Sequence, residues 1–416
     1  MKLLKAIKSG HPGTLFSAFL YFDISFMVWV LLGPLAVYIS QDLALTAAQK
    51  GLMVAIPILS GALLRIPMGI LTDRIGPKKS GLLGMIMTLA PLIWGWQFAQ
   101  NLTQVIALGL LLGVAGASFA VALPLASRWY STEHQGIAMG IAGAGNSGTV
   151  LAALLAPRLA ESIGWHGVLG VASIPVSFTL VTFFFLAEDS PDQPGPRPLR
   201  EYFKVLKGSD IWWFNYFYGI TFGGFVGLAS FLVIFFVDQY GLARVTAGNF
   251  TAACVFAGSF FRPLGGYLAD RFGGVRVLTI LYGLAALCML GVGALPPLAM
   301  VTFLLFLGML CLGMGNGSVF QLVPQRYRSE IGVVTGIVGA AGGIGGFFLP
   351  TLLGYLKEFT GSYGTGFFVF GLAAVTALIL LQVVYSLSWQ TSWLSRRIEI
   401  APVEGGRIRM EVVFGG

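Results

Sequence analysis

The hydrophobic pattern of this 416-residue chain consists of long apolar stretches separated by short segments with charged residues, glycine or proline. A helix needs about 20 mainly apolar residues to cross the hydrocarbon core of a bilayer. Twelve stretches reach roughly this length, at 14–40, 47–73, 79–99, 103–128, 136–160, 167–187, 211–237, 247–269, 277–294, 298–323, 332–356 and 365–388. They predict an all-α membrane protein with twelve transmembrane helices, the first of which is too long for a cleaved signal peptide.

The amino-acid composition agrees with this prediction, because 56% of the residues are hydrophobic and only 10% are charged. An ordinary soluble domain has about 25% charged residues. The three cysteines lack CxxC or CxxxC spacing and the three histidines share no ligand spacing. We therefore expect no disulfide framework, no metal site and no cofactor. The chain also has no nucleophile and base pair and no nucleotide-binding loop, so we do not expect an enzyme.

The distribution of lysine and arginine predicts the orientation in the membrane, since these residues favour cytoplasmic loops. With the N-terminus inside, nineteen of the 25 basic residues fall on the cytoplasmic side, two lie within spans, and four lie outside: Lys50, Arg158, Arg244 and Lys357. We expect a multi-pass protein of the inner (cytoplasmic) membrane with both termini in the cytoplasm. The net charge of +8 then reflects topology and contact with the lipid bilayer, and we expect no nucleic-acid partner.

A polar, proline-rich segment divides the chain into two halves of six spans each. The segment EDSPDQPGPRPLREYFK, which begins at Glu188, cannot continue a membrane helix and is typical of a linker. The predicted organisation is an N-terminal six-helix bundle, a cytoplasmic linker, a C-terminal six-helix bundle and a cytoplasmic tail, at 1–188, 189–208, 209–389 and 390–416. The tail contains the alternating pattern RIRMEVVF, which favours a strand, although a lone strand is not stable.

Matching strings in the two halves indicate an internal repeat. RIPMGILTDRIG begins at Arg65 and RPLGGYLADRFG begins at Arg262, 197 residues later. GIAMGIAGAGNSG (136–148) aligns with GVVTGIVGAAGGI (332–344), and GASFAVALP is similar to GSVFQLVP. Duplicated six-helix halves are the architecture of secondary transporters, which hold their substrate near the middle of the membrane between the repeats. We therefore expect two bundles related by a pseudo-two-fold axis.

These residues resemble a known family. GILTDRIGPKK (69–79) and GYLADRFGGVR (266–276) are similar to the loop motif of the major facilitator superfamily, and AGAGNSG and GAAGGIGG resemble the paired nitrate signatures of its nitrate/nitrite porter family. The resemblance extends from about residue 14 to 388. It implies the major facilitator fold and a secondary active transporter that moves nitrate, and nitrite, by alternating access. The alternative is a carrier for another small anion, such as formate or oxalate. We expect a functional monomer.

Arg65 and Arg262 are the two basic residues within predicted spans. Placing a guanidinium group at the bilayer centre costs a few kcal/mol of free energy on insertion scales, so we expect each of these arginines to have a functional role. Each precedes an aspartate by eight residues, about 12 Å along a helix, which puts both near the middle of a core about 30 Å thick. The planar, forked guanidinium groups suit a flat anion. Binding of such an anion would offset the repulsion between the two arginines and would promote closure of the two halves around it. Alternatively, each arginine neutralises a buried carboxylate or caps helix carbonyls.

The resemblance also implies the remaining binding residues. Phe119 and Phe320 would sandwich the planar anion with their rings, and Tyr218 and Asn146 would complete the hydrogen-bond donors. Phe222 is four residues from Tyr218, so it shares a helix face and would pack beside it. Because the chain contains 33 phenylalanines, the alternative for any one of them is a side chain that faces lipid.

Two further groups are expected to act in conformational change. The signature glycines allow close helix packing that slides or bends, and the main candidates are Gly143, Gly145, Gly339, Gly342 and Gly343. The charges of the loop motifs could latch one half to the other in a single state, and they are Asp73, Arg74, Asp270 and Arg271. The alternative for these charges is a solvated, positive cytoplasmic loop.

Asp23 is the one carboxylate well within a predicted span. It could pair with an arginine, take up a proton during transport, or face a packing surface where hydroxyl groups hold it. Three coupling mechanisms are therefore consistent with the sequence: symport of nitrate with protons, exchange of nitrate for nitrite, or both.

Overall fold

The structure is a computed structural model that describes residues 7–191, 200, 204–327, 331–394, 396–402 and 408–414. Within helix α8, the side chains of residues 132, 133 and 135–137 are not described. Most of the linker predicted at 189–208 lies outside the described residues.

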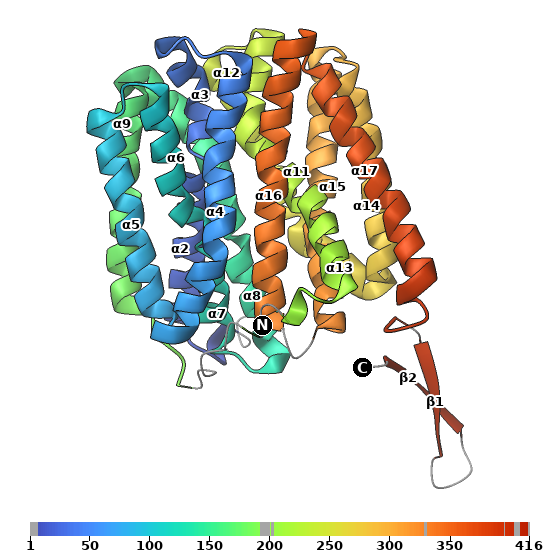
Figure 1. The fold of residues 1–416 in the computed structure, drawn as a ribbon. Helices are drawn as coiled ribbons and strands as arrows, with labels where there is room; N and C mark the ends of the chain where they lie inside the picture. The colour runs from blue at the N-terminus through green and yellow to red at the C-terminus, as the bar shows by residue number, and fades with distance from the viewer. Residues whose placement is uncertain are drawn as a thin grey trace.

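The first half of the chain forms helices that run side by side (blue to green in Figure 1). Their bounds are α2 (Pro12–Trp29), α3 (Leu32–Asp42), α4 (Ala47–Ile75), α5 (Pro77–Phe98), α6 (Leu102–Gly116), α7 (Phe119–Ser127), α8 (Thr132–Gly143), the 3₁₀ turn η1 (Ala144–Ser147) and α9 (Gly148–Leu186). The second half lies beside them: α11 (Ser209–Tyr240), α12 (Arg244–Phe260), α13 (Arg262–Phe272), α14 (Gly274–Gly293), α15 (Leu298–Arg326), α16 (Ile331–Thr360), α17 (Gly364–Val384) and the π-helical turn η2 (Tyr385–Trp389).

Ten stretches of the described residues are long and apolar enough to cross a membrane. One of them, Ala138–Leu186, contains two predicted spans, because α9 includes a kink at Gly164, whose φ of 69° is readily adopted by glycine. The eighth predicted span is divided at Phe261 into α12 and α13, each shorter than a full crossing. Pro263 follows at the start of α13, where its missing N–H is tolerated. Each of the twelve predicted spans therefore corresponds to helix, and the chain is a polytopic membrane protein whose membrane-spanning part is all-α.

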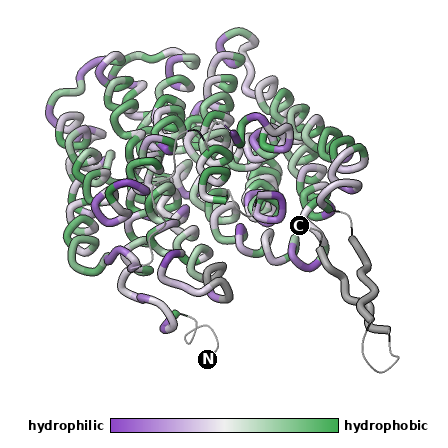
Figure 2. The backbone as a smooth tube through the Cα atoms, turned by 60° about the horizontal axis from the view of Figure 1, so that its bottom comes forward, coloured by the Kyte–Doolittle hydropathy of each residue, from purple (hydrophilic) through white to green (hydrophobic). Residues whose placement is uncertain are grey.

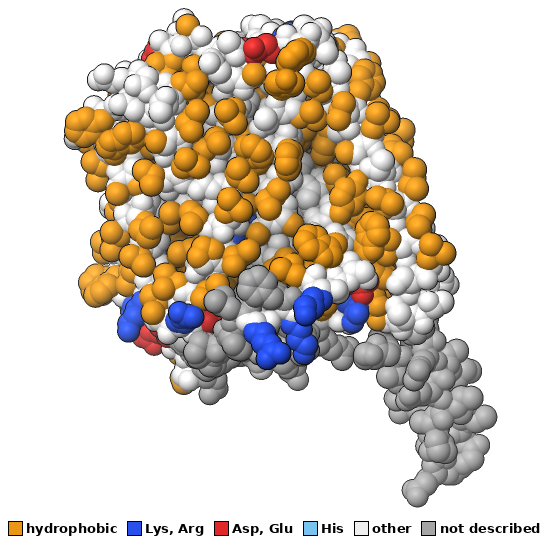
Figure 3. Space-filling view, viewed as in Figure 1, with side chains coloured by type: hydrophobic (Ala, Val, Ile, Leu, Met, Phe, Trp, Pro, Cys, Tyr) orange, Lys and Arg blue, Asp and Glu red, His pale blue; other side chains and the backbone are white. Residues whose placement is uncertain are grey.

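The surface of the bundle is apolar on its sides and basic at one end. Large side chains such as Phe185, Leu287 and Leu387 are exposed, as expected where the solvent is lipid. Lysines and arginines gather at the end where α4 and α13 terminate (Figure 3), and hydrophilic segments lie mainly in loops and at helix ends (Figure 2). We call this end the basic face, after its exposed residues Arg74, Lys79, Arg271, Arg276 and Arg326.

At the opposite face the two halves are in close contact. Lys50 on α4 forms an ion pair of 2.8 Å with Asp238 on α11, and the backbone N–H of Ala48 donates to Glu358 on α16 at 2.9 Å. Glycines allow α4 and α16 to approach closely here, since a Cβ on Gly51 would contact the Gly354 Cα at 3.1 Å. The bundle is therefore closed at this face.

Toward the basic face the halves separate around two cavities of about 680 Å³ and 330 Å³. Both are lined by residues from each half, and the shared ones are Phe119, Leu123, Met139, Ile331 and Thr335. The larger cavity extends from Arg262 to Asp270 and Gln325 near the basic face. This conformation is thus closed at the opposite face and hollow toward the basic face.

The tail folds back on itself beyond the bundle (Figure 1). Strand β1 (Arg396–Pro402) pairs antiparallel with β2 (Ile408–Phe414), with Arg396 opposite Phe414. The strand suggested by RIRMEVVF therefore has a partner within the tail.

Candidate functional site

Arg65 lies at the centre of the bundle and is 1% exposed. Its Nε donates to the carbonyl of Gly116 at 3.2 Å, and its Nη1 donates to the carbonyl of Gly339 in the other half. The Nη2 has no hydrogen-bond partner among the described residues. The expectation that an arginine caps helix carbonyls thus holds for two of its nitrogens, while the third stays available to a ligand.

Aromatic rings enclose the Arg65 guanidinium. Its central carbon lies 5.3 Å from the ring of Trp29, 5.4 Å from that of Phe119 and 5.2 Å from that of Phe222. Such contacts stabilise a cation by about 0.5–2 kcal/mol each. Rings from both halves therefore offset part of the cost of burying this charge without neutralising it.

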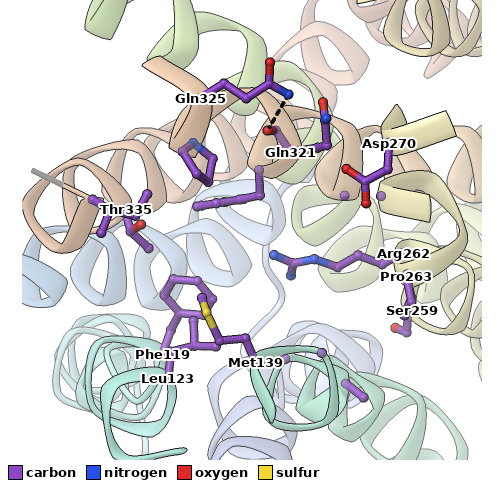
Figure 4. Close-up of a pocket in the computed structure, with 18 residues that line it drawn as sticks. Phe119, Leu123, Met139, Ser259, Arg262, Pro263, Asp270, Gln321, Gln325 and Thr335 are labelled. Atoms are coloured by element: carbon purple, nitrogen blue, oxygen red, sulfur yellow. Dashed lines mark hydrogen bonds between the residues drawn. The ribbon is translucent and has the colours of Figure 1, made fainter. Parts of the chain in front are cut away.

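Arg262 is the first residue of α13, directly after the break at Phe261. It points into the larger cavity, across from Phe119 and Met139 (Figure 4). Its guanidinium carbon lies 5.8 Å from the Phe320 ring, and its Nη1 is buried with no partner in the described part of the chain. Arg65 and Arg262 lie beside the two rings of the Phe119–Phe320 pair, and within the described ranges neither arginine forms an ion pair with a carboxylate.

The structure brings the predicted aromatic residues together. The rings of Phe119 and Phe320 come from opposite halves, and their centroids lie 6.3 Å apart at an interplanar angle of 55°. Tyr218 meets Phe320 edge to face at 4.8 Å and stacks on Phe222 at 5.1 Å. In this conformation the first two rings contact each other rather than lying parallel with a gap for an anion. All four residues border the same centre as the arginines.

Asn146 lies in η1, the 3₁₀ turn between α8 and α9, and is 1% exposed. Its carbonyl accepts hydrogen bonds from Thr149 at 2.6 Å and from Ser259 of the other half at 3.4 Å. Neither atom of its side-chain amide has a partner among the residues that the structure describes. A 3₁₀ segment within a helix often marks a functional hinge, and here it presents an unpaired amide.

Asp23 is held by a hydroxyl group. The Ser147 Oγ donates to its Oδ1 at 2.5 Å, and a Cβ on Gly148 would collide with its carbonyl oxygen. Asp23 makes no ion pair with an arginine in the described parts of the chain. Of the three expectations for this residue, the arginine pair is absent from this conformation and the hydroxyl contact is present.

The signature glycines have different surroundings. A Cβ on Gly342 or Gly343 would contact Tyr218 or Ala62 at 2.5 Å, and one on Gly145 would contact Phe22 at 2.6 Å. Gly339 accepts the hydrogen bond from Arg65. Gly143 instead lines the larger cavity, and no described atom lies within 4 Å of a Cβ built on it. Glycine is thus required for close packing at three of these five positions.

The loop charges do not join the halves in this conformation. Asp73 pairs with Arg128 of its own half at 2.8 Å, and Asp270 borders the cavity. Arg74 and Arg271 are exposed and have no ion pair within the described ranges. Among the described residues, the ion pair that joins the halves is Lys50 with Asp238, which lies at the opposite face and was not predicted.

Sequence reasoning also missed Trp29, Ser147 and Ser259, which contact predicted site residues. The described residues hold no group of three or more histidine, cysteine or acidic side chains that could bind a metal. The centre instead combines two cations, the unpaired amide of Asn146, a phenol and aromatic rings, a donor set suited to a small anion.

Sequence comparison relates this chain to known membrane transporters. The sequence model of the Major Facilitator Superfamily matches residues 17–350. A relative from Bacillus subtilis (strain 168), named nitrite extrusion protein, is 34% identical over 367 residues, which cover 88% of this chain and 91% of the relative. The probable nitrate transporter NarT of Staphylococcus carnosus (strain TM300) is 35% identical over 357 residues, which cover 86% and 92% of the two chains.

Solved structures share the fold at low sequence identity. The human organic anion transporter MFSD10 (TETRAN) superposes with a TM-score of 0.70 at 15% identity, covering 89% of this chain and 99% of that one. A bacterial homolog to the human lysosomal transporter Spinster, in an inward-facing and occupied conformation, gives 0.65 at 18% identity, covering 91% and 96%. At these identities the likeness concerns the fold alone.

Proposed function

Because the chain belongs to the Major Facilitator Superfamily, we propose that it carries nitrate and nitrite across the cytoplasmic membrane by alternating access. The names of the relatives from Bacillus and Staphylococcus support this substrate class. The observation that carries the proposal is the pair Arg65 and Arg262: each half contributes one guanidinium with an unpaired N–H, and no described carboxylate pairs with either.

The anion binds between these two cations. The Nη2 of Arg65 and the Nη1 of Arg262 are the unpaired guanidinium donors, and the hydroxyl of Tyr218 and the amide of Asn146 add two more. Phe119 and Phe320 exclude water from the flat faces of the anion. A hydrogen bond to a charged group contributes about 1.5–3 kcal/mol, so several of them together can offset the loss of the hydration shell.

Binding of the anion drives closure of the cavity. Without it, two like charges in a poorly hydrated pore repel, which favours separated halves. An anion between them turns repulsion into attraction and draws the halves together toward the basic face. The contacts at the opposite face, including Lys50 with Asp238, then open as one bundle (1–188) rocks against the other (209–389) about the site. The linker at 189–208 keeps the halves joined, and a monomer is sufficient.

The basic face is the cytoplasmic face in this proposal. Lysine and arginine favour the cytoplasmic side of membrane proteins, and the exposed basic residues gather at that end of the bundle (Figure 3). Both termini then lie in the cytoplasm, and the conformation described is inward-open. The loop charges Asp73, Arg74, Asp270 and Arg271 act as a latch in the outward-open state, when their ends of the halves approach each other.

Asp23 is the proposed site of the coupling proton. Its carboxyl group is buried and contacts η1, the turn that carries Asn146, through Ser147. Gain or loss of a proton there changes a hydrogen bond next to the substrate. Exchange of nitrate for nitrite does not require this step, because both anions carry the same charge.

The experiment that tests this function is uptake of labelled nitrate by proteoliposomes that contain the purified protein. Nitrite inside the vesicles, or an acidic medium outside them, should stimulate uptake relative to symmetric conditions. Unlabelled formate and oxalate are added in turn as competitors. Uptake no greater than in protein-free liposomes would refute nitrate transport, and stronger competition by formate or oxalate than by nitrite would favour a carrier of carboxylates.

A further inference from the structure

Asn316, in the middle of α15, is a buried amide that no predicted function uses. Its side chain is 0% exposed, and neither its Nδ2 nor its Oδ1 has a hydrogen-bond partner among the described residues. Buried polar groups in folded proteins nearly always have partners, because an unpaired one loses its hydration without compensation. An amide with both atoms unpaired therefore indicates a partner that binds from outside the chain.

The position of Asn316 is next to the site. It precedes Phe320 by one helical turn, so the two side chains share a face of α15. The ring of Phe320 contacts Tyr218 at 4.8 Å and lies 5.8 Å from the Arg262 guanidinium carbon. The following residue, Gly317, packs so closely on α13 that a Cβ there would collide with the Arg262 carbonyl oxygen.

Asn316 also lies just beyond the inner end of the cavity. Five α15 residues that follow it line the larger cavity, whereas Asn316 does not, and they are Gly317, Phe320, Gln321, Pro324 and Gln325. Because α15 runs toward the basic face and ends there at Arg326, the amide is about one turn, or roughly 5 Å, deeper than Phe320. A ligand drawn to the deep end of the cavity would meet this amide.

The two halves thus offer the same chemistry from different helices. Each contributes one arginine with an unpaired N–H and one asparagine with an unpaired amide: Arg65 with Asn146, and Arg262 with Asn316. The arginines are related by the sequence repeat, but the asparagines are not. When GASFAVALP is aligned with GSVFQLVP, the counterpart of Asn316 in the first half is Ala115.

We propose that Asn316 is a further anion-binding residue, whose Nδ2 donates a hydrogen bond to the bound oxyanion from the second half. This inference rests on the proposed transport of nitrate. In the anion-bound state, the Oδ1 of the same amide would accept one N–H of the Arg262 Nη1, and the second N–H of that nitrogen would donate to the anion; both atoms are unpaired in this conformation. A carboxamide suits this place because it supplies a donor and an acceptor together, whereas an ammonium group only donates and a carboxylate only accepts.

A role in binding and a role in folding predict opposite effects on stability. If Asn316 held the fold together, its replacement by the similarly sized but apolar leucine would lower the melting temperature. If its amide instead binds an anion and has no partner in the ligand-free protein, Asn316→Leu removes two unpaired polar atoms. The melting temperature of the ligand-free protein should then stay the same or rise. The affinity for nitrate should nevertheless fall about tenfold or more.

The test measures the melting temperature of the full-length protein in detergent at increasing nitrate concentrations, together with nitrate uptake in proteoliposomes. Asn316→Leu and Asn316→Asp are compared with the wild type and with Asn215→Leu. Asn215 is a matched control, since its Oδ1 is also unpaired in the described structure, but it lines an apolar pocket at the side of the bundle with Trp212 and Ile66.

We expect nitrate to stabilise the wild type and Asn215→Leu at similar concentrations. Asn316→Leu should need about tenfold more nitrate, and Asn316→Asp should lose the response because a carboxylate repels the anion. Wild-type nitrate affinity in either Asn316 variant would overturn the inference and leave the proposed function intact. A lower melting temperature of ligand-free Asn316→Leu would also overturn it, in favour of a structural amide. A wild type that neither binds nor transports nitrate would refute the proposed function, and this inference with it.

Discussion

The Nη1 of Arg65 donates a hydrogen bond to the carbonyl oxygen of Gly339, across the boundary between the two halves of the bundle. The same guanidinium holds the carbonyl of Gly116 in its own half through Nε, and its Nη2 has no partner among the described residues. One side chain therefore links the signature segment of α16 to α6 while it keeps a donor free. A ligand that binds Nη2 is connected directly to the contact between halves.

Arg65→Lys should lose most nitrate uptake although it keeps the positive charge. A single ammonium group cannot reach two carbonyls and an anion in the directions that the planar fork reaches. Loss of one or two hydrogen bonds to a charged group predicts a fall of roughly 10- to 100-fold in kcat/KM. Initial rates of uptake over a range of nitrate concentrations measure this. Arg276→Lys, at an exposed site on the basic face, is the control and should transport normally.

Near-normal uptake by Arg65→Lys, with the control also normal, would contradict a site that depends on the fork. A comparable loss in both variants would point to a general sensitivity of the protein to changes at arginine.

The ion pair of Lys50 with Asp238 should favour the conformation closed at the opposite face. Tyr363 also donates to Asp238, at 2.9 Å. The pair is partly exposed, so we expect a contribution of up to about 1 kcal/mol, or a shift of up to about fivefold in the populations of the two conformations. Spin labels on the two halves at the opposite face should report longer distances in Lys50→Asp, and the exchanged pair Lys50→Asp with Asp238→Lys should restore the shorter ones. Unchanged distances in the single variant would exclude a role in closure.

Asp23→Asn should separate proton coupling from anion exchange. The amide oxygen can still accept the hydrogen bond from Ser147, but the side chain can no longer bind or release a proton. We expect stimulation of uptake by an acidic medium to disappear while exchange of nitrate for internal nitrite continues. Proteoliposome uptake at two external pH values measures both. Ser147→Ala, which keeps the carboxyl group, is the control and should retain some acid stimulation; full acid stimulation in Asp23→Asn would locate the proton elsewhere.

Phe119→Leu should raise the KM for nitrate more than it changes protein stability. Leucine fills much of the same apolar volume but lacks the ring that faces the Arg65 guanidinium at 5.4 Å and the Phe320 ring at 6.3 Å. Loss of a desolvated cation–π contact of about 1–2 kcal/mol predicts a rise of roughly 5- to 30-fold. Phe178→Leu, at a ring that is 65% exposed on the side of the bundle, provides the comparison and should leave the KM unchanged. Equal KM values in the two variants would argue against a role of the Phe119 ring in the site.

The hydrophobic pattern predicted most of the fold because span length and helix continuity are local properties. The predicted span 47–73 corresponds to α4, which covers Ala47–Ile75. The pattern could not predict the break at Phe261, since an apolar run is equally consistent with one helix or with two. The proline at 263 was the available signal, but proline is common in membrane helices.

The binding site was partly predictable because its two arginines occupy equivalent positions in the internal sequence repeat. A string that recurs with its arginine in both halves identifies Arg65 and Arg262 without structural data. The repeat does not identify Asn316, because the equivalent position in the first half is Ala115. The pair of Lys50 and Asp238 joins residues 188 positions apart, and it depends on which end of the bundle is closed. Hydrophobic periodicity does not determine that choice between conformations.

The basic face, toward which the cavity extends, has a consequence for the kinetics of anion entry. A positively charged rim raises the local concentration of anions and speeds their diffusion toward the opening, and added salt weakens this attraction over a Debye length of about 8 Å at physiological ionic strength. Capture from the solution at the basic face should therefore slow as ionic strength rises, even where the affinity of the deep site, shielded by protein, changes little. The same rim makes departure into that solution slower than it would be from a neutral vestibule.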